Sequence, residues 1–324
     1  MNDTLYLAPI RGVTDSIYRN AFHKHFGGFD IAITPFIASF KGVKLKPKVF
    51  REVLPENNNA MPLIPQIIGN DAEDIINVSK LLFNLGYKDV NLNFGCPHKM
   101  VAKRGRGSGI LPFPEKMDEL LSNIIPNIPN RLSIKVRLGR ITTDEIFNLI
   151  PVFNKHELAE VTIHARTGIQ MYEGTVFLDV FEKCYKLIDH QVVYNGDIFY
   201  YEDIIELKKR FPDITKWMIG RGAMVNPFLP GEIKSDNTLQ IADKIEILKD
   251  FHDEVYQEYS KVLFGPASIL GRMKEFWYYY SHQFVNNKKI LKKIQKTNST
   301  NNYEDIVNKF FQNDAELQKH DFIS

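Results

Sequence analysis

One cysteine stands where it could serve as an acid. Cys96 lies between Gly95 and Pro97, directly after the apolar run at 90–93, and Pro97 favours an extended backbone at the residue before it. An ordinary cysteine thiol, with a pKa of about 8.5, is mostly protonated at neutral pH and can act as a general acid. A free cysteine is more often a small buried hydrophobe. We expect Cys184, on a helical pattern without polar company, to be inert in that way.

Two glycine-containing stretches could bind a phosphate. They lie at 195–197 and 220–222, each directly after a late apolar run. Glycines let backbone N–H groups approach an anion, a helix N-terminus adds a favourable dipole, and an arginine can bind phosphate through two hydrogen bonds. Each stretch alone could simply be a tight turn, but the pair together favours a phosphate site. The residues concerned are Asn195, Gly196, Asp197, Gly220 and Arg221.

Three more polar residues end apolar runs. Lys135 needs a negative partner inside a barrel mouth, which the electron-rich edge of a reduced flavin could supply; an ion pair with a carboxylate is the alternative. The amide of Gln66 could both donate to and accept from a flavin edge, or could be a satisfied core glutamine. His164, with Arg166 pointing the same way two positions on, could be functional or a structural hydrogen bonder.

The chain that carries these residues follows a repeated pattern. Eight short apolar runs alternate with amphipathic stretches, which predicts an α/β fold, a (β/α)8 TIM barrel, over residues 1–240. Active sites of such barrels form at the C-terminal ends of the strands, where these polar residues fall. Beyond Pro227 and Pro230 the pattern is helical, so we predict a C-terminal all-helical domain over 241–324. The runs are 5–8, 31–33, 63–67, 90–93, 132–136, 160–163, 192–194 and 217–219.

The composition is that of an ordinary core-forming protein. The chain has 324 residues, 44% hydrophobic, with 41 Lys and Arg against 39 Asp and Glu and only two cysteines, which excludes a disordered chain and a disulfide scaffold. We find no apolar run of about 18 residues that could span a membrane and no basic-then-apolar leader at the N-terminus, so we expect a cytoplasmic setting. No metal site and no protein partner is indicated, and we expect a monomer.

The motifs together resemble those of a known family. In order along the chain, they are similar to the motifs of the tRNA-dihydrouridine synthases, flavin enzymes that reduce specific uridines in tRNA. The stretches Asn93-Phe94-Gly95-Cys96-Pro97 and His164-Ala165-Arg166-Thr167-Gly168 are the most specific. The matching segments are 7–15, 91–97, 134–139, 164–168, 195–198 and 218–227.

The resemblance implies a cofactor and a mechanism. It implies bound FMN, reduced by NADPH in a separate half-reaction, and makes Cys96 the acid that protonates C5 of the uracil while hydride from flavin N5 reaches C6. Two departures stand near the flavin, since the family usually has Met at the position of Ile10 and a small or acidic residue at that of Arg11. The FMN contacts implied are Pro9, Ile10, Arg11, Gln66, Lys135, His164, Asn195, Gly196, Asp197, Gly220 and Arg221.

A tRNA substrate predicts basic surface around the barrel mouth and on the helical domain. The stretch 272–296 holds seven Lys and Arg against Glu275 alone, and aromatics at 276–280 could stack on bases; the alternative, preferred for Trp277 and Lys292, is a core stripe with a solvated lysine face. Reaching a uridine in folded tRNA requires extruding the base, which predicts an open mouth. Further basic residues are Lys41, Lys44, Lys46, Lys48, Lys103, Arg104 and Arg106, and the tRNA contacts we predict are Asn93, Arg166, Lys99, Arg272 and Lys274.

Two other functions stay open at this point. An FMN barrel of the dihydropyrimidine dehydrogenase kind would act on a free small molecule and would need neither the basic stretch nor the helical domain. A catalytically silent RNA-binding barrel would take up no FMN. The regions 36–54 and 272–277 look most like the bacterial group that modifies position 16 of the D-loop.

Overall fold

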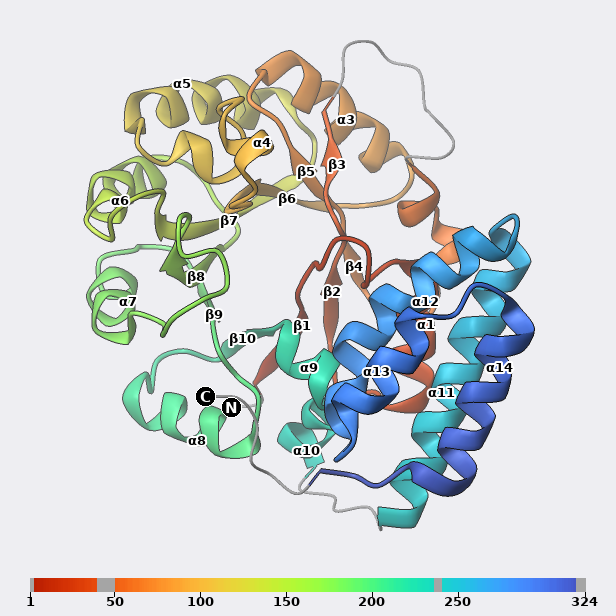
Figure 1. Ribbon diagram of the computed structural model, residues 1–324. Helices are drawn as coiled ribbons and strands as arrows, with labels where there is room; N and C mark the ends of the chain where they lie inside the picture. Colours follow the sequence, from red (N-terminus) through yellow and green to blue (C-terminus); the bar gives the residue numbers. More distant parts are fainter. Residues whose placement is uncertain (1–2, 40–49, 236–240, 319–324) are drawn as a thin grey trace.

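Short parallel strands alternate with helices through the first two-thirds of the chain (Figure 1). The computed structural model describes residues 3–39, 50–235 and 241–318, so the lysines predicted at 41–48 and the predicted boundary near 240 lie outside the described residues. The strands pair in the order β3-β5-β6-β7-β8-β9-β10-β1-β2-β4. They are β1 (Thr4–Leu7), β2 (Ile31–Ile33), β3 (Ile37–Ala38), β4 (Leu63–Ile64), β5 (Gln66–Ile68), β6 (Asp89–Phe94), β7 (Arg131–Gly139), β8 (Val161–Thr167), β9 (Val192–Asn195) and β10 (Lys216–Ile219).

The sheet closes at Pro65. This residue has no N–H group to donate, and it divides the predicted run at 63–67 into β4 and β5. β4 pairs with β2, where Ala32 faces Leu63, while β5 pairs with β6, where Gln66 faces Asn91. Because one residue joins β4, the last strand of the order, to β5, the second strand, the sheet curls back to its start there. All eight predicted runs are strands, and the TIM-barrel prediction is confirmed; β3 is an addition that the pattern missed.

Helices surround the barrel (Figure 1). Asp15 caps α1 by accepting from the backbone N–H of Tyr18, and Asp71 caps α3 by accepting from that of Asp74. The helices are α1 (Ser16–His25), α3 (Ala72–Asn84), α4 (Lys99–Ala102), α5 (Pro114–Ile124), α6 (Glu145–Lys155), α7 (Leu178–Tyr185), α8 (Tyr201–Arg210), α9 (Arg221–Val225) and α10 (Leu229–Ser235), with 3₁₀ turns η1 (Arg51–Val53), η2 (Pro55–Asn57), η3 (Gly107–Ile110) and η4 (Ile125–Asn127).

The regular elements described from residue 241 onward are helical, as predicted, apart from one isolated bridge between Phe284 and Leu317. Trp277 is fully buried and donates to the hydroxyl of Tyr303 at 2.8 Å, which confirms the core position preferred for it. Among the described residues, no helix combines the length and apolar character that a membrane span requires. The elements are α11 (Ile241–Val262), α12 (Pro266–Tyr280), η5 (Ser281–Gln283), α13 (Asn287–Gln295), α14 (Thr300–Lys309) and the π turn η6 (Phe310–Asp314).

The helical region packs against α1, with α11 and α12 beside it (Figure 1). Phe251 of α11 is 1% exposed, and its ring lies 5.5 Å from that of Tyr18 and 4.9 Å from that of Phe26. The hydroxyl of Tyr259 donates to Asp15 at 2.8 Å. One continuous hydrophobic core therefore joins the barrel to the helices behind it.

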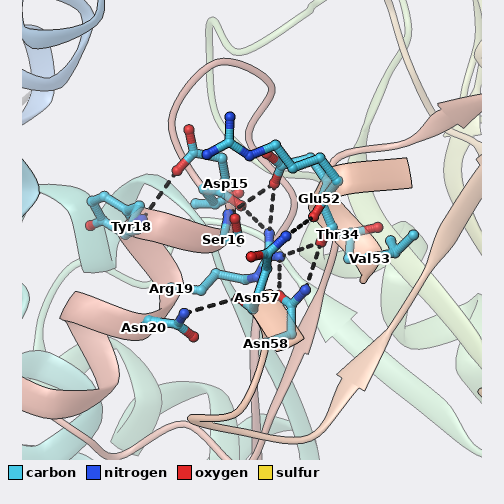
Figure 2. A network of polar contacts seen from close by, with 12 residues as sticks. Asp15, Ser16, Tyr18, Arg19, Asn20, Thr34, Glu52, Val53, Asn57 and Asn58 are labelled. Atoms are coloured by element: carbon cyan, nitrogen blue, oxygen red, sulfur yellow. Dashed lines mark hydrogen bonds and ion pairs between the residues drawn. The ribbon is translucent and has the colours of Figure 1, made fainter. Parts of the chain in front are cut away.

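A buried polar network holds the loop between β1 and α1 (Figure 2). Arg19 is 1% exposed and donates to the carbonyls of Thr14 (2.7 Å) and Glu52 (2.8 Å) and to Asn58. The carboxylate of Glu52 accepts from the backbone N–H of Ser16 at 2.8 Å and lies 3.6 Å from Arg19. Burial raises the pKa of Glu52 and lowers that of Arg19. The network therefore fixes the loop segment that comes directly after residues 9–11.

Candidate active site

The C-terminal ends of the strands surround a cavity of about 1160 Å³, counting the space at its open mouth. This compares with the upper end of the range for small-molecule sites, about 300–1,000 Å³. Predicted residues from six strand ends meet on its wall, as the barrel geometry requires. They are Pro9, Ile10, Arg11, Asn93, Cys96, Lys135, His164, Asn195, Gly196, Asp197, Gly220 and Arg221.

Cys96 is held in place through its backbone. Asn93 accepts with its amide oxygen from the N–H groups of Gly95 (3.0 Å) and Cys96 (2.8 Å). Ser108 donates to the Cys96 carbonyl with its backbone N–H (3.0 Å) and its hydroxyl (2.9 Å). Gly107, at φ +55°, packs so closely that a Cβ there would lie 2.8 Å from that of Cys96. The half-buried thiol is therefore directed by a rigid loop on the cavity wall.

Gln66 lies outside the cavity wall. It is fully buried, and its amide oxygen accepts from Asn93 at 2.7 Å while its amide nitrogen donates to Asn91 at 2.8 Å. Asn91 donates in turn to Ser133 at 2.9 Å. The structure thus gives Gln66 the surroundings of a satisfied core glutamine, and it supports Asn93, which does line the cavity.

Positive charge gathers along β7 and β8. Lys135 donates to the amide oxygen of Asn195 at 2.6 Å, and burial, with the charge of Arg137 nearby, lowers the pKa of Lys135 to about 7. Burial, with the same arginine as the next cause, lowers the pKa of His164 well below its usual value, so this histidine is neutral at physiological pH. Arg137 lines the cavity but was not among the predicted site residues, although its spacing of two from Lys135 along a strand was a usable signal.

The two glycine-containing stretches meet at one corner of the cavity. Asp197 accepts from both arginines there, Arg166 at 2.9 Å and Arg221 at 3.0 Å. Arg166 is 2% exposed and also donates to the carbonyl of Gly174 at 2.5 Å. The structure therefore does not present Arg166 to RNA, because Asp197 and backbone carbonyls occupy its guanidinium group; it orients Asp197 instead.

Tyr172 is a cavity residue that the sequence did not reveal. Its ring is half exposed and lies 5.4 Å from the guanidinium carbon of both Arg137 and Arg221. The preceding residue, Met171, also lines the cavity and has φ +52°, in the left-handed region. No periodicity marks these residues, because they lie in the irregular loop after β8.

The predicted tRNA contacts outside the cavity are distributed over two helices. Lys99 is exposed at the start of α4. Arg272 of α12 donates to the carbonyl of Gly12 and lies 3.2 Å from the carboxylate of Glu275, while Lys274 donates to the carbonyl of Thr297 at 2.7 Å. Both α12 side chains are thus partly committed to contacts within the protein.

The cavity suits an anionic ligand with an apolar ring. Lys135 bonds to a neutral amide, and within the described part of the chain Asp197 is the single carboxylate on the wall, already bonded to two arginines. Apolar walls come from Pro9, Ile10 and Pro97 among others. This donor set fits a flavin phosphate. Among the described residues no group of three His, Cys, Asp or Glu side chains could hold a metal ion.

The chain is similar to several known proteins. The family model described as dihydrouridine synthase matches residues 6–320. The chain is 27% identical over 238 residues to a protein named tRNA-dihydrouridine(16) synthase from Cupriavidus necator, covering 71% of this chain and 73% of the relative. It is 28% identical over 312 residues to a probable tRNA-dihydrouridine synthase 2 from Bacillus subtilis, covering 94% and 93%. Morphinone reductase, solved with tetrahydroNAD, shares the fold, with TM-score 0.52 at 10% identity over 73% of this chain and 87% of that one.

Proposed function

The chain belongs to the dihydrouridine synthase family, and on that premise we propose that it is a tRNA-dihydrouridine synthase that reduces the C5–C6 bond of specific D-loop uridines. The observation that carries the proposal is the placement of Cys96 on the wall of a cavity whose charged residues are mostly cationic. A tRNA substrate gives the protein a cytoplasmic place of action, and we propose that it works as a monomer. Position 16, named in several relatives, is the first uridine to examine.

We propose FMN as the bound cofactor and NADPH as its reductant. When bound, FMN would supply the hydride that C6 of the uracil requires. Lys135 donates toward an electron-rich ring edge, and neutral His164 can offer a ring N–H without adding charge. Gly196, Gly220 and Arg221 form the phosphate corner. Pro9, Ile10 and Asn195 complete the wall on the barrel side.

Cys96 donates the proton that C5 of the uracil requires. When its Sγ–H bond breaks, the sulfur is left with a negative charge, and Lys135 and Arg137 lie near enough for their positive charges to act on it. Asn93 fixes the loop that carries the thiol and also faces the cavity. Arg137 is therefore a member of the proposed site that sequence reasoning alone did not include.

The uridine must leave its stack to reach this cavity, and the open mouth allows it. Asn93, Lys99 and Lys274 are the proposed contacts to tRNA, and Arg272 holds the loop at Gly12. We propose residues 1–240 as the catalytic domain and 241–324 as the tRNA-binding domain, joined through one core.

Purified, FMN-loaded protein should convert uridine to dihydrouridine in unmodified tRNA transcripts with NADPH. Cys96→Ala should slow this conversion by about 10²–10⁴-fold, because general acid catalysis is lost, while FMN stays bound. Cys184→Ala is the matched control, since Cys184 is fully buried on α7 and away from the cavity. Mass spectrometry of the tRNA measures the product, and visible absorbance measures the flavin.

Three outcomes would overturn parts of the proposal. Unchanged turnover by Cys96→Ala removes the thiol from the mechanism. Turnover of free uracil or dihydroorotate in place of tRNA favours a small-molecule enzyme. A colourless protein that takes up no FMN favours a silent RNA-binding barrel.

A further inference from the structure

A second hollow of about 710 Å³, open to solvent, adjoins the active-site cavity on the side of α12. Arg11 lines both hollows and so stands on the wall between them. The second hollow includes residues far apart in the sequence, brought together where the loop after β1 meets α12 and the end of α13. They include Arg11, Val13, Lys274, Tyr278, Tyr279 and Gln295.

The charges of this hollow favour an anion. Arg11 is exposed, and its guanidinium carbon lies 5.7 Å from the ring centre of Phe36, within the range of a cation–π contact. The hydrogen bond from Lys274 to the Thr297 carbonyl fixes the lysine at the wall. Glu275 also lines the hollow, but its carboxylate lies 3.2 Å from Arg272, so its charge is partly balanced by a residue outside it.

The same hollow offers an aromatic surface. Tyr278 is 55% exposed, whereas its neighbours Phe276, Trp277 and Tyr280 are buried in the helical core. Its ring lies 5.0 Å from that of Tyr279 at an interplanar angle of 89°, so Tyr279 supports it edge-on. A supported, exposed ring beside two cations has the chemistry of a site for one nucleotide, since bases stack on aromatic faces and phosphates pair with guanidinium groups.

We propose that this hollow binds the nucleotide next to the target uridine, with its base on Tyr278 and its phosphate between Arg11 and Lys274. The proposal rests on the RNA substrate of the proposed function. It gives Arg11 a role toward RNA in place of the flavin contact that the resemblance implies. Continuity through Arg11 explains how one strand could place a uridine in the cavity and its neighbour in the hollow.

The backbone beside Arg11 is arranged to keep it there. Gly12 has φ +85°, and its carbonyl accepts from Arg272 of α12. A Cβ at Gly12 would approach Glu275 to 3.1 Å, so a side chain would crowd the junction as well as strain the turn. Helix α12 thus supplies one wall of the hollow and, through its contacts with Gly12, positions Arg11 on the opposite wall.

Two variants test the hollow in the FMN-loaded protein. Tyr278→Ala should weaken tRNA binding about tenfold, because a stacking surface is removed, while Tyr278→Phe keeps the ring and should stay within twofold of wild type. Arg11→Ala should reduce the slope of log affinity against log salt by about 0.7–0.9, the value for one phosphate contact. Arg131→Ala is the charge-matched control, since Arg131 is exposed at the start of β7, at the opposite end of the barrel.

Modified RNA substrates make the test specific. When the neighbouring nucleotide proposed to stack on Tyr278 is made abasic, the loss of affinity caused by Tyr278→Ala should vanish. When the phosphate of that nucleotide is replaced by a methylphosphonate, the loss of affinity caused by Arg11→Ala should vanish. Penalties that persist on both substrates, affinities that equal wild type, or an Arg11→Ala protein that loses FMN would overturn the proposal. Failure of the proposed function would be recognised separately, because wild-type protein would then form no dihydrouridine. The binding measurements would still show whether the hollow binds a nucleotide.

Discussion

Lys135 and Arg137 lie two positions apart on β7, so both side chains point to the same face and enter the barrel mouth. Burial penalises the charge of Lys135, and repulsion by the nearby Arg137 adds to that penalty, which is why the pKa of Lys135 falls to about 7. Such an arrangement is unfavourable without an anionic ligand. At the scale of residues, the site therefore holds buried positive charge without an anionic partner, at the place where the proposed flavin and thiolate would lie.

The pH dependence of folding should reveal this charge. In FMN-free protein, Lys135 is protonated below pH 7 in both states, so the folded state carries the full penalty of burying it. Between pH 7 and 10 the folded state loses the proton and the unfolded state keeps it, so stability from this residue rises with pH. Lys135→Met should be more stable at pH 6 by on the order of 2 kcal/mol, with the difference shrinking toward pH 9.5.

Denaturant unfolding of the two FMN-free proteins at a series of pH values measures this effect. Curves of unfolding free energy that run parallel from pH 6 to 9.5 would show that Lys135 keeps an ordinary pKa in the folded protein. Restriction to pH values below 9.5 avoids the tyrosines that ionise in the unfolded chain.

Most residues of the cavity wall were predictable from the sequence, but the hydrogen bonds that some of them make were not. Residue type and position at a strand end were enough for Lys135 and His164. They could not show that Arg166 is turned onto Asp197, because that pairing joins β8 to the loop after β9 and depends on side-chain geometry. Tyr172 gave no signal, since loop residues follow no periodicity.

At the scale of elements, the loop after β6 and the glycine-containing turn that follows it act as one unit. Gly105 and Gly107 both have positive φ, but only at Gly107 would a Cβ strike Cys96, at 2.8 Å. Near Gly105 the nearest atom to an added Cβ is in the side chain of Asn70, at an ordinary 3.5 Å. Substitutions at these two positions can therefore distinguish the effect of backbone strain from the effect of displacing the Cys96 thiol.

Gly107→Ala should slow uridine reduction about tenfold or more, because displacing a reacting group by as little as 1 Å is costly, while FMN binding stays unchanged. Gly105→Ala, with similar backbone strain of about 1–2 kcal/mol, should keep most of its activity. Single-turnover reduction of tRNA measures both. Equal rates for the two variants would contradict a closely packed position for Cys96.

Element types followed from periodicity, whereas the exceptions have local causes. The run at 63–67 predicted one strand, and Pro65 makes it two, because proline cannot donate to the ladder. β3 spans only Ile37–Ala38, too short for any alternation to show. The helical character beyond 241 was visible in the sequence, but the way α11 packs on α1 was not, since tertiary contacts leave no periodic signal.

At the scale of the whole molecule, the barrel and the helices share a core centred on Phe251, which contacts aromatic rings of both α1 and α12. Phe251→Ala should lower the free energy of unfolding by about 3–5 kcal/mol, the usual cost of removing a buried phenylalanine ring.

Because the barrel and the helices share this core, loss of helical circular dichroism and release of FMN should coincide when the protein is heated. Two separate transitions, with FMN retained after the first, would show that the helical region melts independently.

We propose that this protein forms dihydrouridine in tRNA through Cys96. The most direct test is a position-by-position map of dihydrouridine in total tRNA from cells with the gene, without it, and without it but supplied with either wild-type protein or Cys96→Ala. Without the gene, dihydrouridine should be lost at a D-loop position, and wild-type protein but not Cys96→Ala should restore it. Identical maps with and without the gene, or full restoration by Cys96→Ala, would contradict it.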